Sequence, residues 1–237
     1  MKRSDGRTEA TQLRAFAASQ SLLNRADGSA KFSFGTHLNS YLGESTVVAS
    51  VVGPAEVKIR DEKMDEATVE LIVRPAVGFP TTKEKVLERA LRQTMEPTIL
   101  SGMMPRTLIQ IVVQIEQVDG NILSTAVNAI SLAMLDAGLP MSSLVASITA
   151  AIDQQDNILL DPSSQELENA TSVHTFAFDN TSSYNLLLSH SAGAFSEDQY
   201  FSCLEACKHA SERVHAFIRT AVEKKIQKEY QQLQSSS

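Results

Sequence analysis

The stretch from Asp119 to Gly138 constrains the fold most, because it joins a tight turn to a long run of small and apolar residues. Asp119-Gly120 is a turn signal, and Ser124 or Thr125 is a candidate cap for a helix that starts just after it. The glycine at the end of the run, closely followed by a proline, is a typical stop signal. The stretch therefore predicts a buried helix whose N-terminus is approached by a loop.

The N-terminus of such a helix is a natural anion site, since its free backbone N–H groups and the positive end of the helix dipole point toward the loop. Tight binding of a phosphate usually adds a cationic side chain. Between Asp119 and Asp136, however, the sequence has no Lys, Arg or His. The scaffold of an anion site is predicted here, but its charged residue is missing.

Runs of apolar and β-branched residues predict strands on both sides of this helix, and segments with helical spacing separate them. The run 46–52 is almost entirely apolar, which is typical of a central strand. Strands are predicted at 30–34, 46–52, 67–73, 108–116, 144–152, 158–160, 172–178 and 185–189, and helices from 81, after Gly120 and from 197, with a short acidic helical turn at 161–168. This order predicts an α+β fold with mixed sheets packed by helices.

The chain has no clean internal repeat and no linker, so a single domain over residues 1–237 is predicted. Residues 1–23 are interpreted as an N-terminal arm lying on that domain. Residues 36–44 are too many for an ordinary hairpin connection and are interpreted as a loop insertion. Residues 231–237 are expected to fray from the last helix.

Composition narrows the classes of function. The formal net charge is −7 and the pI is near 5.3, which argues against a protein that binds nucleic acid over its whole surface and leaves room for a local basic patch. The sequence has two cysteines, no N-terminal signal segment and no apolar run long enough to span a bilayer. An intracellular protein without membrane contact is therefore expected.

Two groups of residues are candidates for a metal site. Cys203 and Cys207, with His209 nearby, supply half of a site, but no other segment supplies the missing ligands, so buried thiols are favoured. A second group, consisting of Asp161, Glu166 and Glu168, would suit a divalent ion, although acidic residues are also common at helix starts. No metal and no cofactor are predicted.

One histidine and a row of basic residues are further candidates. His174 lies within a predicted strand and no nucleophile motif accompanies it, so a structural histidine is favoured over a catalytic one. Lys85, Arg89 and Arg92 follow helical spacing, and Arg74, Lys83 and Arg106 are near in sequence. Such a row can grip RNA phosphates without reading bases. The alternative is a solvated helix face paired with Glu84 and Glu88.

Several short motifs, taken together, resemble those of the RNase PH family of phosphate-dependent 3′→5′ exoribonucleases. They occur in the family's order and cover nearly the whole chain. They are Arg3-Ser-Asp-Gly-Arg7, Ala26-Asp-Gly-Ser-Ala-Lys-Phe-Ser-Phe-Gly35, Ser50-Val-Val-Gly-Pro-Ala-Glu56, Leu87-Glu-Arg-Ala-Leu-Arg92, Pro105-Arg106, Asp119-Gly120 with Leu135-Asp-Ala-Gly138, and Leu160-Asp161. The resemblance implies the RNase PH fold, a duplicated βαβα core like that of ribosomal protein S5 domain 2, and assembly into six-membered rings around an RNA channel.

Within that family the chain is similar to the non-catalytic ring subunits of the eukaryotic RNA exosome, of the ribosomal RNA processing protein 46 type. The residues that carry this likeness lie at 70–78, 81–88, 159–166 and 172–175. The likeness implies hetero-oligomeric partners, namely other RNase PH-like ring subunits and an S1/KH cap subunit. It also implies RNA in the channel, rRNA maturation and mRNA turnover, and a place in the nucleus, nucleolus and cytoplasm. By the same resemblance, Arg89, Arg92 and Arg106 are expected near RNA.

Active members of the family carry a Gly-Gly-Thr-Arg-Thr loop whose Arg holds the attacking phosphate. On this chain the loop falls on residues 120–124, so that Leu123 stands where the Arg would be. An apolar side chain cannot neutralise a phosphate dianion. Active members also have an Asp pair six residues apart, whereas residues 162–174 offer only Glu166 and Glu168, expected on an exposed turn.

The two losses together predict an inactive relative of these nucleases. Two alternatives stay open at this point. One is a phosphate-dependent exoribonuclease with an altered site. The other is a homodimeric nucleic-acid-binding protein that acts outside any ring.

Overall fold

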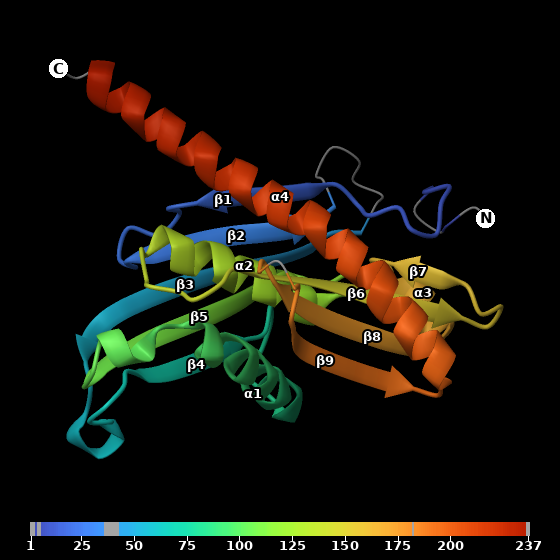
Figure 1. Cartoon of the computed structure of the whole chain (residues 1–237), viewed down its shortest axis with the longest axis horizontal. Coiled ribbons are helices and arrows are strands. Elements are labelled where there is room, and N and C mark those ends of the chain that lie inside the picture. The colour runs from blue at the N-terminus through green and yellow to red at the C-terminus, as the bar shows by residue number, and fades with distance from the viewer. Residues whose placement is uncertain (1–2, 4–5, 36–42, 182, 236–237) are drawn as a thin grey trace.

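The chain folds into two β-sheets that share a central helix, with a long C-terminal helix laid across them (Figure 1). The computed structural model describes residue 3 and residues 6–35, 43–181 and 183–235. The predicted α+β class is confirmed. Within the described ranges, no helix has the length and apolarity needed to traverse a bilayer.

The first sheet contains five strands in the order β1-β2-β3-β5-β4. Strands β4 and β5 run parallel, while the other neighbours are antiparallel, so this sheet is mixed as predicted. Burial alternates along β3, β4 and β5, because every second side chain faces the core. The bounds are β1 Phe16–Gln20, β2 Gly28–Phe34, β3 Ser45–Glu56, β4 Thr68–Arg74 and β5 Thr107–Gln117.

The second sheet has the order β7-β6-β8-β9 and is antiparallel throughout. The prediction of mixed sheets is therefore wrong for this half of the chain. Strands β6 and β7 form a hairpin across the turn after Asp153. The bounds are β6 Val145–Asp153, β7 Ile158–Leu160, β8 Ala170–Asp179 and β9 Leu186–Gly193.

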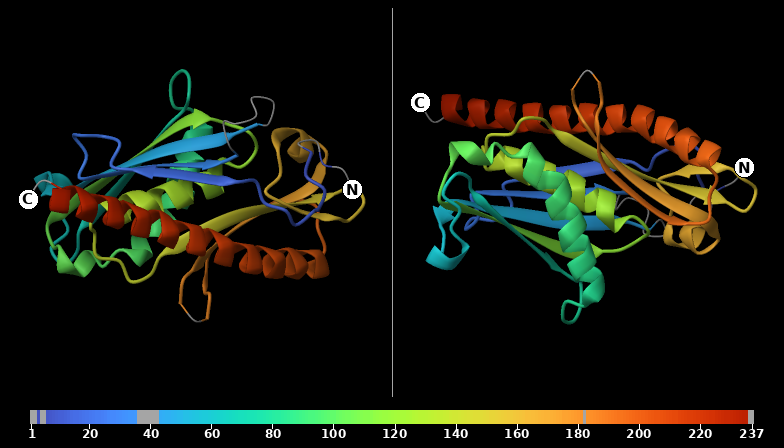
Figure 2. Two further views of the ribbon diagram at one scale, coloured as in Figure 1. Left: turned by 90° about the horizontal axis from the view of Figure 1, so that it is seen from above. Right: turned by 60° about the horizontal axis from the view of Figure 1, so that its bottom comes forward.

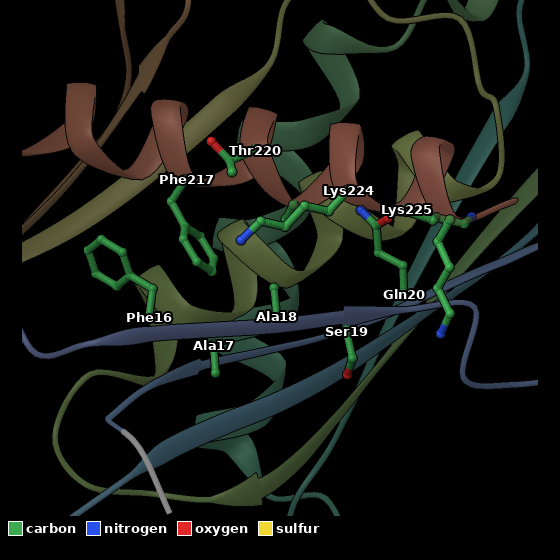
Figure 3. A pocket seen from close by; sticks show the side chains of 11 residues that line it. Phe16, Ala17, Ala18, Ser19, Gln20, Phe217, Thr220, Lys224 and Lys225 are labelled. Carbon is green, nitrogen blue, oxygen red and sulfur yellow. The ribbon is translucent and has the colours of Figure 1, made fainter. Parts of the chain in front are cut away.

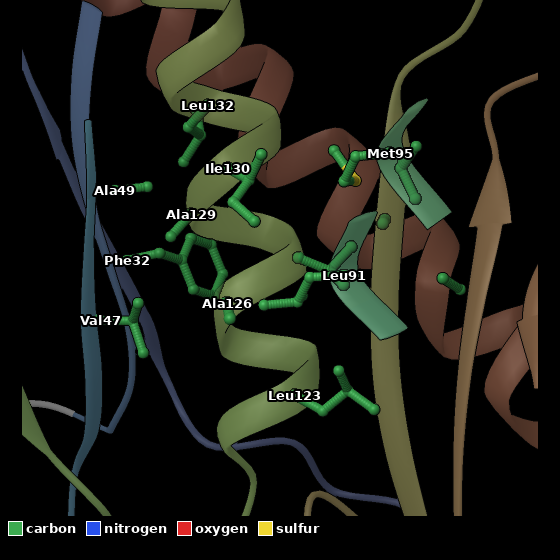
Figure 4. Packing of buried hydrophobic residues seen from close by; sticks show 14 of the residues in the cluster. Phe32, Val47, Ala49, Leu91, Met95, Leu123, Ala126, Ala129, Ile130 and Leu132 are labelled. Carbon is green, nitrogen blue, oxygen red and sulfur yellow. The ribbon is translucent and has the colours of Figure 1, made fainter. Parts of the chain in front are cut away.

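Helix α2 (Ile122–Asp136) is the predicted buried helix, and it contacts strands of both sheets. Figure 4 shows Phe32, Val47 and Ala49 of the first sheet on one side of it. On the second sheet, the amide of Asn128 exchanges two hydrogen bonds with the backbone of Ser147, at 3.0 and 2.8 Å. Because these bonds satisfy its polar group, the helix can be buried on nearly every side.

Helix α1 (Thr82–Met95) lies against β4 and also contacts α2 and β9. It begins with a capping box in which Thr81 and Glu84 bond to each other's backbone N–H groups. The helix ends at Met95, and Pro97 lies in the short 3₁₀ turn η2 (Glu96–Thr98). The other short helical turns are η1 (Ile59–Asp61), η3 (Ser101–Met103) and α3 (Ser164–Glu168).

Helix α4 (Glu197–Ser235) runs along the whole molecule, from the second sheet to β1 of the first (Figure 2). Phe217 of α4 packs on Phe16 and Phe32, with ring centroids 5.4 and 6.0 Å apart. The ammonium group of Lys225 bonds to Asp136 at the end of α2. These contacts fix α4 to the first sheet.

Three predictions about the ends and the insertion have different outcomes. The segment 1–23 is not an arm throughout, since Phe16–Gln20 pairs with β2 as an edge strand. The expected fraying from residue 231 is wrong as far as Ser235, where α4 is still helical, and residues 236–237 lie outside the described part. The insertion 36–44 falls mostly on residues 36–42, which also lie outside it.

Candidate functional site

The N-terminus of α2 is reached from β5 through a turn formed by Asp119, Gly120 and Asn121. Gly120 has a φ of +95°, and a Cβ there would lie 2.4 Å from the carbonyl oxygen of Pro162. The turn therefore needs glycine and presses directly on the segment that follows β7. This close approach brings the α2 N-terminus and the acidic segment 161–168 into one site.

The capping prediction for this helix is wrong. The N-cap position belongs to Asn121, whose side chain makes no capping bond, and Ser124 and Thr125 lie inside the first turn. The hydroxyl of Thr125 donates to the carbonyl of Asn121, and the hydroxyl of Thr149 donates to the Asn121 side-chain oxygen at 2.6 Å. The helix start is thus held from the second sheet, and its own N–H groups receive no side-chain cap.

Leu123, in the first turn of α2, faces the core. Its exposed fraction is 8%, and it belongs to the same hydrophobic cluster as Leu91 and Met95 of α1 (Figure 4). A side chain in that place supplies packing and no charge. The first turn of α2 therefore presents a packed apolar side chain and no cation, as expected from the sequence.

Cations nevertheless reach the site from the N-terminal segment. Arg14 donates from Nε to Oδ2 of Asp161 at 2.8 Å and from Nη2 to Oδ1 at 2.7 Å, and its Nη1 lies 2.9 Å from Oδ2 of Asp119. The Asp161 side chain is completely buried and the Arg14 side chain is 6% exposed. This is a bidentate pair in a place that water does not reach.

Arg3 makes a second bidentate pair, with Nε and Nη2 at 2.8 and 2.6 Å from the two carboxylate oxygens of Glu166. Arg7 lies between the two pairs, with Nη2 donating to the carbonyl of Asp161 at 2.8 Å. Burial alone would raise the pKa of Glu166, but the bonds from Arg3 and from the Ser163 N–H outweigh it, and the pKa lies below its ordinary value. The carboxylate is ionised at neutral pH.

This network corrects two expectations. Glu166 is not on an exposed turn, since its side chain is 9% exposed and is held by Arg3, whereas Glu168 is exposed as predicted. In the candidate ion site at Asp161, Glu166 and Glu168, the first two carboxylates are already paired with arginine side chains. Within the described ranges, no group of three His, Cys, Asp or Glu side chains is placed to hold a metal.

The arm arginines were not predicted from the sequence as part of this site. Arg3 and Arg7 stood out as a polar N-terminal motif, but Arg14 is separated from Asp161 by 147 positions, and no spacing rule links them. Within the network, Arg3, Arg7 and Arg14 face Asp119, Asp161 and Glu166, so three positive charges meet three negative ones. An incoming phosphate would find no uncompensated cation among these six groups.

Two neutral polar atoms remain at the α2 N-terminus. The Asn121 Nδ2 and Ser124 Oγ atoms are buried and have no hydrogen-bond partner among the described residues. They can satisfy a water molecule or a neutral polar group. By themselves they supply neither the charge nor the proton donor that phosphate-dependent cleavage requires.

The basic residues on α1 form a separate surface. Arg89 and Arg92 are exposed on it, and Arg92 borders a cavity of about 340 Å³ with Lys58. Arg106, before β5, is also exposed and lies 3.7 Å from Glu62. Arg89 and Arg92 are one turn apart on α1, whereas Arg106 lies against the 58–66 segment, where its backbone N–H donates to the Lys63 carbonyl at 3.2 Å.

The alternative interpretation of this helix face holds for part of it. Lys85 pairs with Glu88 at 2.7 Å, and Glu88 also accepts the Val73 N–H at 3.1 Å, which fixes α1 to β4. Glu84 bonds to Thr81 in the capping box. Lys85 therefore belongs to a structural ion pair, while Arg89 and Arg92 have no ion pair within the described residues.

The cysteines and His174 have structural roles, as favoured from the sequence. Cys203 and Cys207 are fully buried, and burial raises the pKa of the Cys203 thiol to about 11. His209 is exposed and so does not complete a site with them. His174 is buried between the hydroxyls of Ser172 and Ser191, at 3.0 and 2.8 Å, and burial lowers its pKa.

Comparison with known proteins decides the family. The family model described as 3′ exoribonuclease family, domain 1, of the RNase PH type, matches residues 12–140, and the model for domain 2 matches residues 143–209. The chain belongs to the RNase PH family of 3′ exoribonucleases. The family resemblance found in the sequence motifs is thereby confirmed.

Relatives within the RNase PH family support the closer likeness. The chain is 36% identical to Exosome complex component RRP46 of Saccharomyces cerevisiae, over 86% of this chain and 94% of that protein. It is 30% identical to Exosome complex exonuclease RRP46 homolog of Oryza sativa, over 94% and 96%. The crystal structure of rice Rrp46 superposes with a TM-score of 0.85 at 30% identity, over 93% of this chain and all of that one. The two family domains correspond to the two sheets, which meet on α2.

Proposed function

We propose that this protein is a non-catalytic ring subunit of the RNA exosome, which shapes the channel for 3′→5′ RNA processing and decay. The proposal rests on the RRP46 names of relatives that align over most of the chain, and on the match to the rice Rrp46 structure. The partners are other RNase PH-like ring subunits and an S1/KH cap subunit. The complex acts in the nucleus and cytoplasm, and its rRNA-processing role places this subunit in the nucleolus as well.

One observation carries the proposed loss of activity. At the α2 N-terminus, where active family members bind the attacking phosphate, Leu123 is buried, and the cations nearby are already neutralised by Asp119, Asp161 and Glu166. A dianion entering this site would have to leave water without gaining a charge partner, which costs several kcal/mol or more.

Contact with RNA is proposed for Arg89, Arg92 and Arg106. All three guanidinium groups reach solvent, and RNA that passes along α1 would meet them as a sequence-independent basic lining. The chain is acidic overall, with a net charge of −7, so RNA contact has to be confined to such local surfaces or shared with neighbouring subunits. This agrees with a channel wall better than with an independent RNA-binding protein.

The principal rival is a phosphate-dependent exoribonuclease with an altered site. Two observations favour it. The rice and Arabidopsis thaliana relatives carry the word exonuclease in their names. In addition, the Asn121 Nδ2 and Ser124 Oγ atoms at the start of α2 are buried and have no hydrogen-bond partner among the described residues, so a small polar ligand would satisfy them.

An activity assay separates the two. The purified chain is incubated with end-labelled RNA, inorganic phosphate and Mg²⁺, and the products are analysed for nucleoside diphosphates. We expect none above the level of a blank preparation. The rival is supported if diphosphates are released by the wild type and this release is lost in Asn121→Ala, while Glu168→Gln, an exposed residue nearby, retains it.

A co-purification experiment tests the ring assignment. The chain is tagged at its C-terminus, since the N-terminal arginines are buried in the site, and is isolated from cells under mild conditions. The proposal predicts RNase PH-like and S1/KH proteins in equal amounts with the tagged chain. Elution as a homodimer without these proteins would instead favour a nucleic-acid-binding protein outside the ring.

A further inference from the structure

A groove lies between the edge strand β1 and residues 217–228 of α4 (Figure 3). Its volume is about 520 Å³. Residues 16–20 of β1 form one wall, and Phe217, Lys224 and Lys228 of α4 stand on the other. The groove thus combines a strand edge, an apolar end and a basic rim.

The hydrogen-bonding register shows which backbone groups of β1 face the groove's open edge. The Ser21 N–H donates to the Ser29 carbonyl at 2.8 Å, and the Gly35 N–H donates to the Ala15 carbonyl at 2.8 Å. In an antiparallel pair such bonded positions alternate with non-bonded ones, so residues 17 and 19 bond to β2. The N–H and C=O groups of Phe16, Ala18 and Gln20 therefore point away from the sheet.

No other strand of the described chain covers this edge, because β1 is the outermost strand of the first sheet. The side chain of Gln20 adds a further unused donor, since its Nε2 atom is buried without a partner within the described residues. An exposed row of backbone donors and acceptors is a template for one more strand. The edge is ready to bind an extended peptide.

The lysines on the rim of the groove favour a peptide with negative charge. Lys224 and Lys228 have no ion-pair partner among the described residues, whereas Lys225 is held by Asp136 and lies 3.5 Å from Glu229. On a strand laid beside β1, every second side chain would face α4 and these ammonium groups. Acidic residues at alternate positions would match them.

We propose that this groove binds an extended acidic segment of a partner protein, which adds to the first sheet as a strand next to β1. A single strand of RNA would also be attracted by the lysines, but its backbone has no regular row of donors and acceptors to match the outward groups of β1. The proposal concerns the groove between β1 and α4 and does not depend on the exosome assignment.

The test uses the full-length chain and a fluorescent peptide that alternates Glu and Val. Matched probes are the same peptide with Lys in place of Glu, and a fluorescent oligoadenylate. The variant Lys224→Glu/Lys228→Glu reverses the rim charge, and Arg213→Glu/Arg219→Glu makes the same change at exposed positions of α4 outside the groove. Binding is followed by fluorescence anisotropy at several salt concentrations.

We expect the acidic peptide to bind the wild type, to bind the lysine variant about tenfold more weakly, and to bind the arginine variant as it binds the wild type. The Lys-containing peptide should not bind. Ala18→Pro removes one outward N–H and should therefore abolish binding. The strand itself should survive, because proline is tolerated on edge strands and the hydrogen bonds between β1 and β2 are kept. Far-UV circular dichroism reports whether the variant is still folded.

Three results would overturn the proposal. The first is that the acidic peptide does not bind, and the second is that it binds both charge-reversal variants equally. The third is that oligoadenylate binds more tightly than the peptide, displaces it, and loses affinity in the lysine variant. The last result would assign the groove to RNA. If Ala18→Pro fails to fold, the lysine variant still decides, since both of its positions are exposed on α4.

Discussion

The guanidinium of Arg14 and the carboxylate of Asp161 form a two-pronged pair, at 2.8 and 2.7 Å, that joins the first fifteen residues to the end of β7. Asp161 itself has a φ of +51° and is completely buried. The strand end, the arm and the turn before α2 therefore meet at the Arg14 guanidinium, which also lies 2.9 Å from Oδ2 of Asp119. Removal of the Arg14 side chain leaves the buried Asp161 carboxylate with Arg7, 3.7 Å away, as its remaining cation among the described residues.

We expect Arg14→Ala to lower the free energy of unfolding by about 3–5 kcal/mol, because it removes both guanidinium hydrogen bonds to the buried Asp161 carboxylate. The matched control is Lys31→Ala, which breaks the exposed pair between Lys31 and Glu116 (2.6 Å) and should cost about 1 kcal/mol or less. Urea unfolding measures both. Equal losses in the two variants would show that the Arg14 pair is no more important than a surface pair.

Leu123 is expected to behave as a core residue. Leu123→Ala should cost about 2–4 kcal/mol through poorer packing, while Leu123→Met, which keeps the volume, should cost less than about 1.5 kcal/mol. Leu123→Arg should be more harmful than either and should not produce nucleoside diphosphates from RNA and phosphate. Recovery of phosphorolysis in Leu123→Arg would mean that the remaining site is intact.

Stability should fall in acid through Glu166. Its pKa in the folded protein lies below the ordinary value of 4.5, so its stabilising contribution is fully present above that pH. The contribution is lost as the pH falls through the folded-state pKa, because the unfolded chain then binds the proton more readily. Glu166→Gln should be less stable than the wild type at neutral pH, and the difference should shrink below pH 4.5.

Urea midpoints measured from neutral pH to about pH 3.5 test this profile. Glu168→Gln is the control, since Glu168 is exposed on the same short helix and has no arginine partner in the described structure. That substitution should leave the pH dependence of stability as it is in the wild type. A constant offset between wild type and Glu166→Gln at every pH would contradict the assignment.

RNA binding by the assembled ring should depend on the α1 arginines. The double variant Arg89→Ala/Arg92→Ala should bind single-stranded RNA more weakly. The slope of log affinity against log salt concentration should become shallower by about 0.7 for each phosphate that the variant no longer neutralises. The same double change at Arg213 and Arg219 on α4 should have no effect. Unchanged binding and salt slope in the α1 variant would remove these residues from the channel surface.

The two sheets should unfold together. Because α2 contacts strands of both, and Asn128 bonds it to β6, opening either sheet exposes the same helix. Hydrogen exchange should therefore give β3 and β8 the same free energy of opening. If β8 exchanges through a separate and smaller opening, the prediction of a single domain over residues 1–237 is wrong.

Local patterns predicted much of the fold. The turn and apolar run at 119–138 predicted α2, and alternating or continuous apolar runs predicted the core strands within a few residues. These signals are local, because they depend on which faces of one element are buried. The edge strand β1 was missed because its two faces differ little, with half-buried and exposed residues alternating.

The site was predicted only in part, for a different reason. Leu123 and the missing cation of α2 are properties of a short segment, and both could be read from the sequence. The pairing of Arg14 with Asp161 and of Arg3 with Glu166 depends on how distant segments meet in the fold. Similarly, the capping role expected for Ser124 and Thr125 failed because the surrounding sheet, through Thr149, holds the helix start.

The order in which the network's parts are synthesised has a consequence for biogenesis. Arg3, Arg7 and Arg14 leave the ribosome well before Asp161 and Glu166, since 147 positions separate Arg14 from Asp161. Until then the leading segment has charges without their final partners, and its closure joins residues of very long sequence separation, which makes it slow to form. Nascent chains halted before β7 should keep this segment open to proteases, and chains extended beyond α3 should protect it.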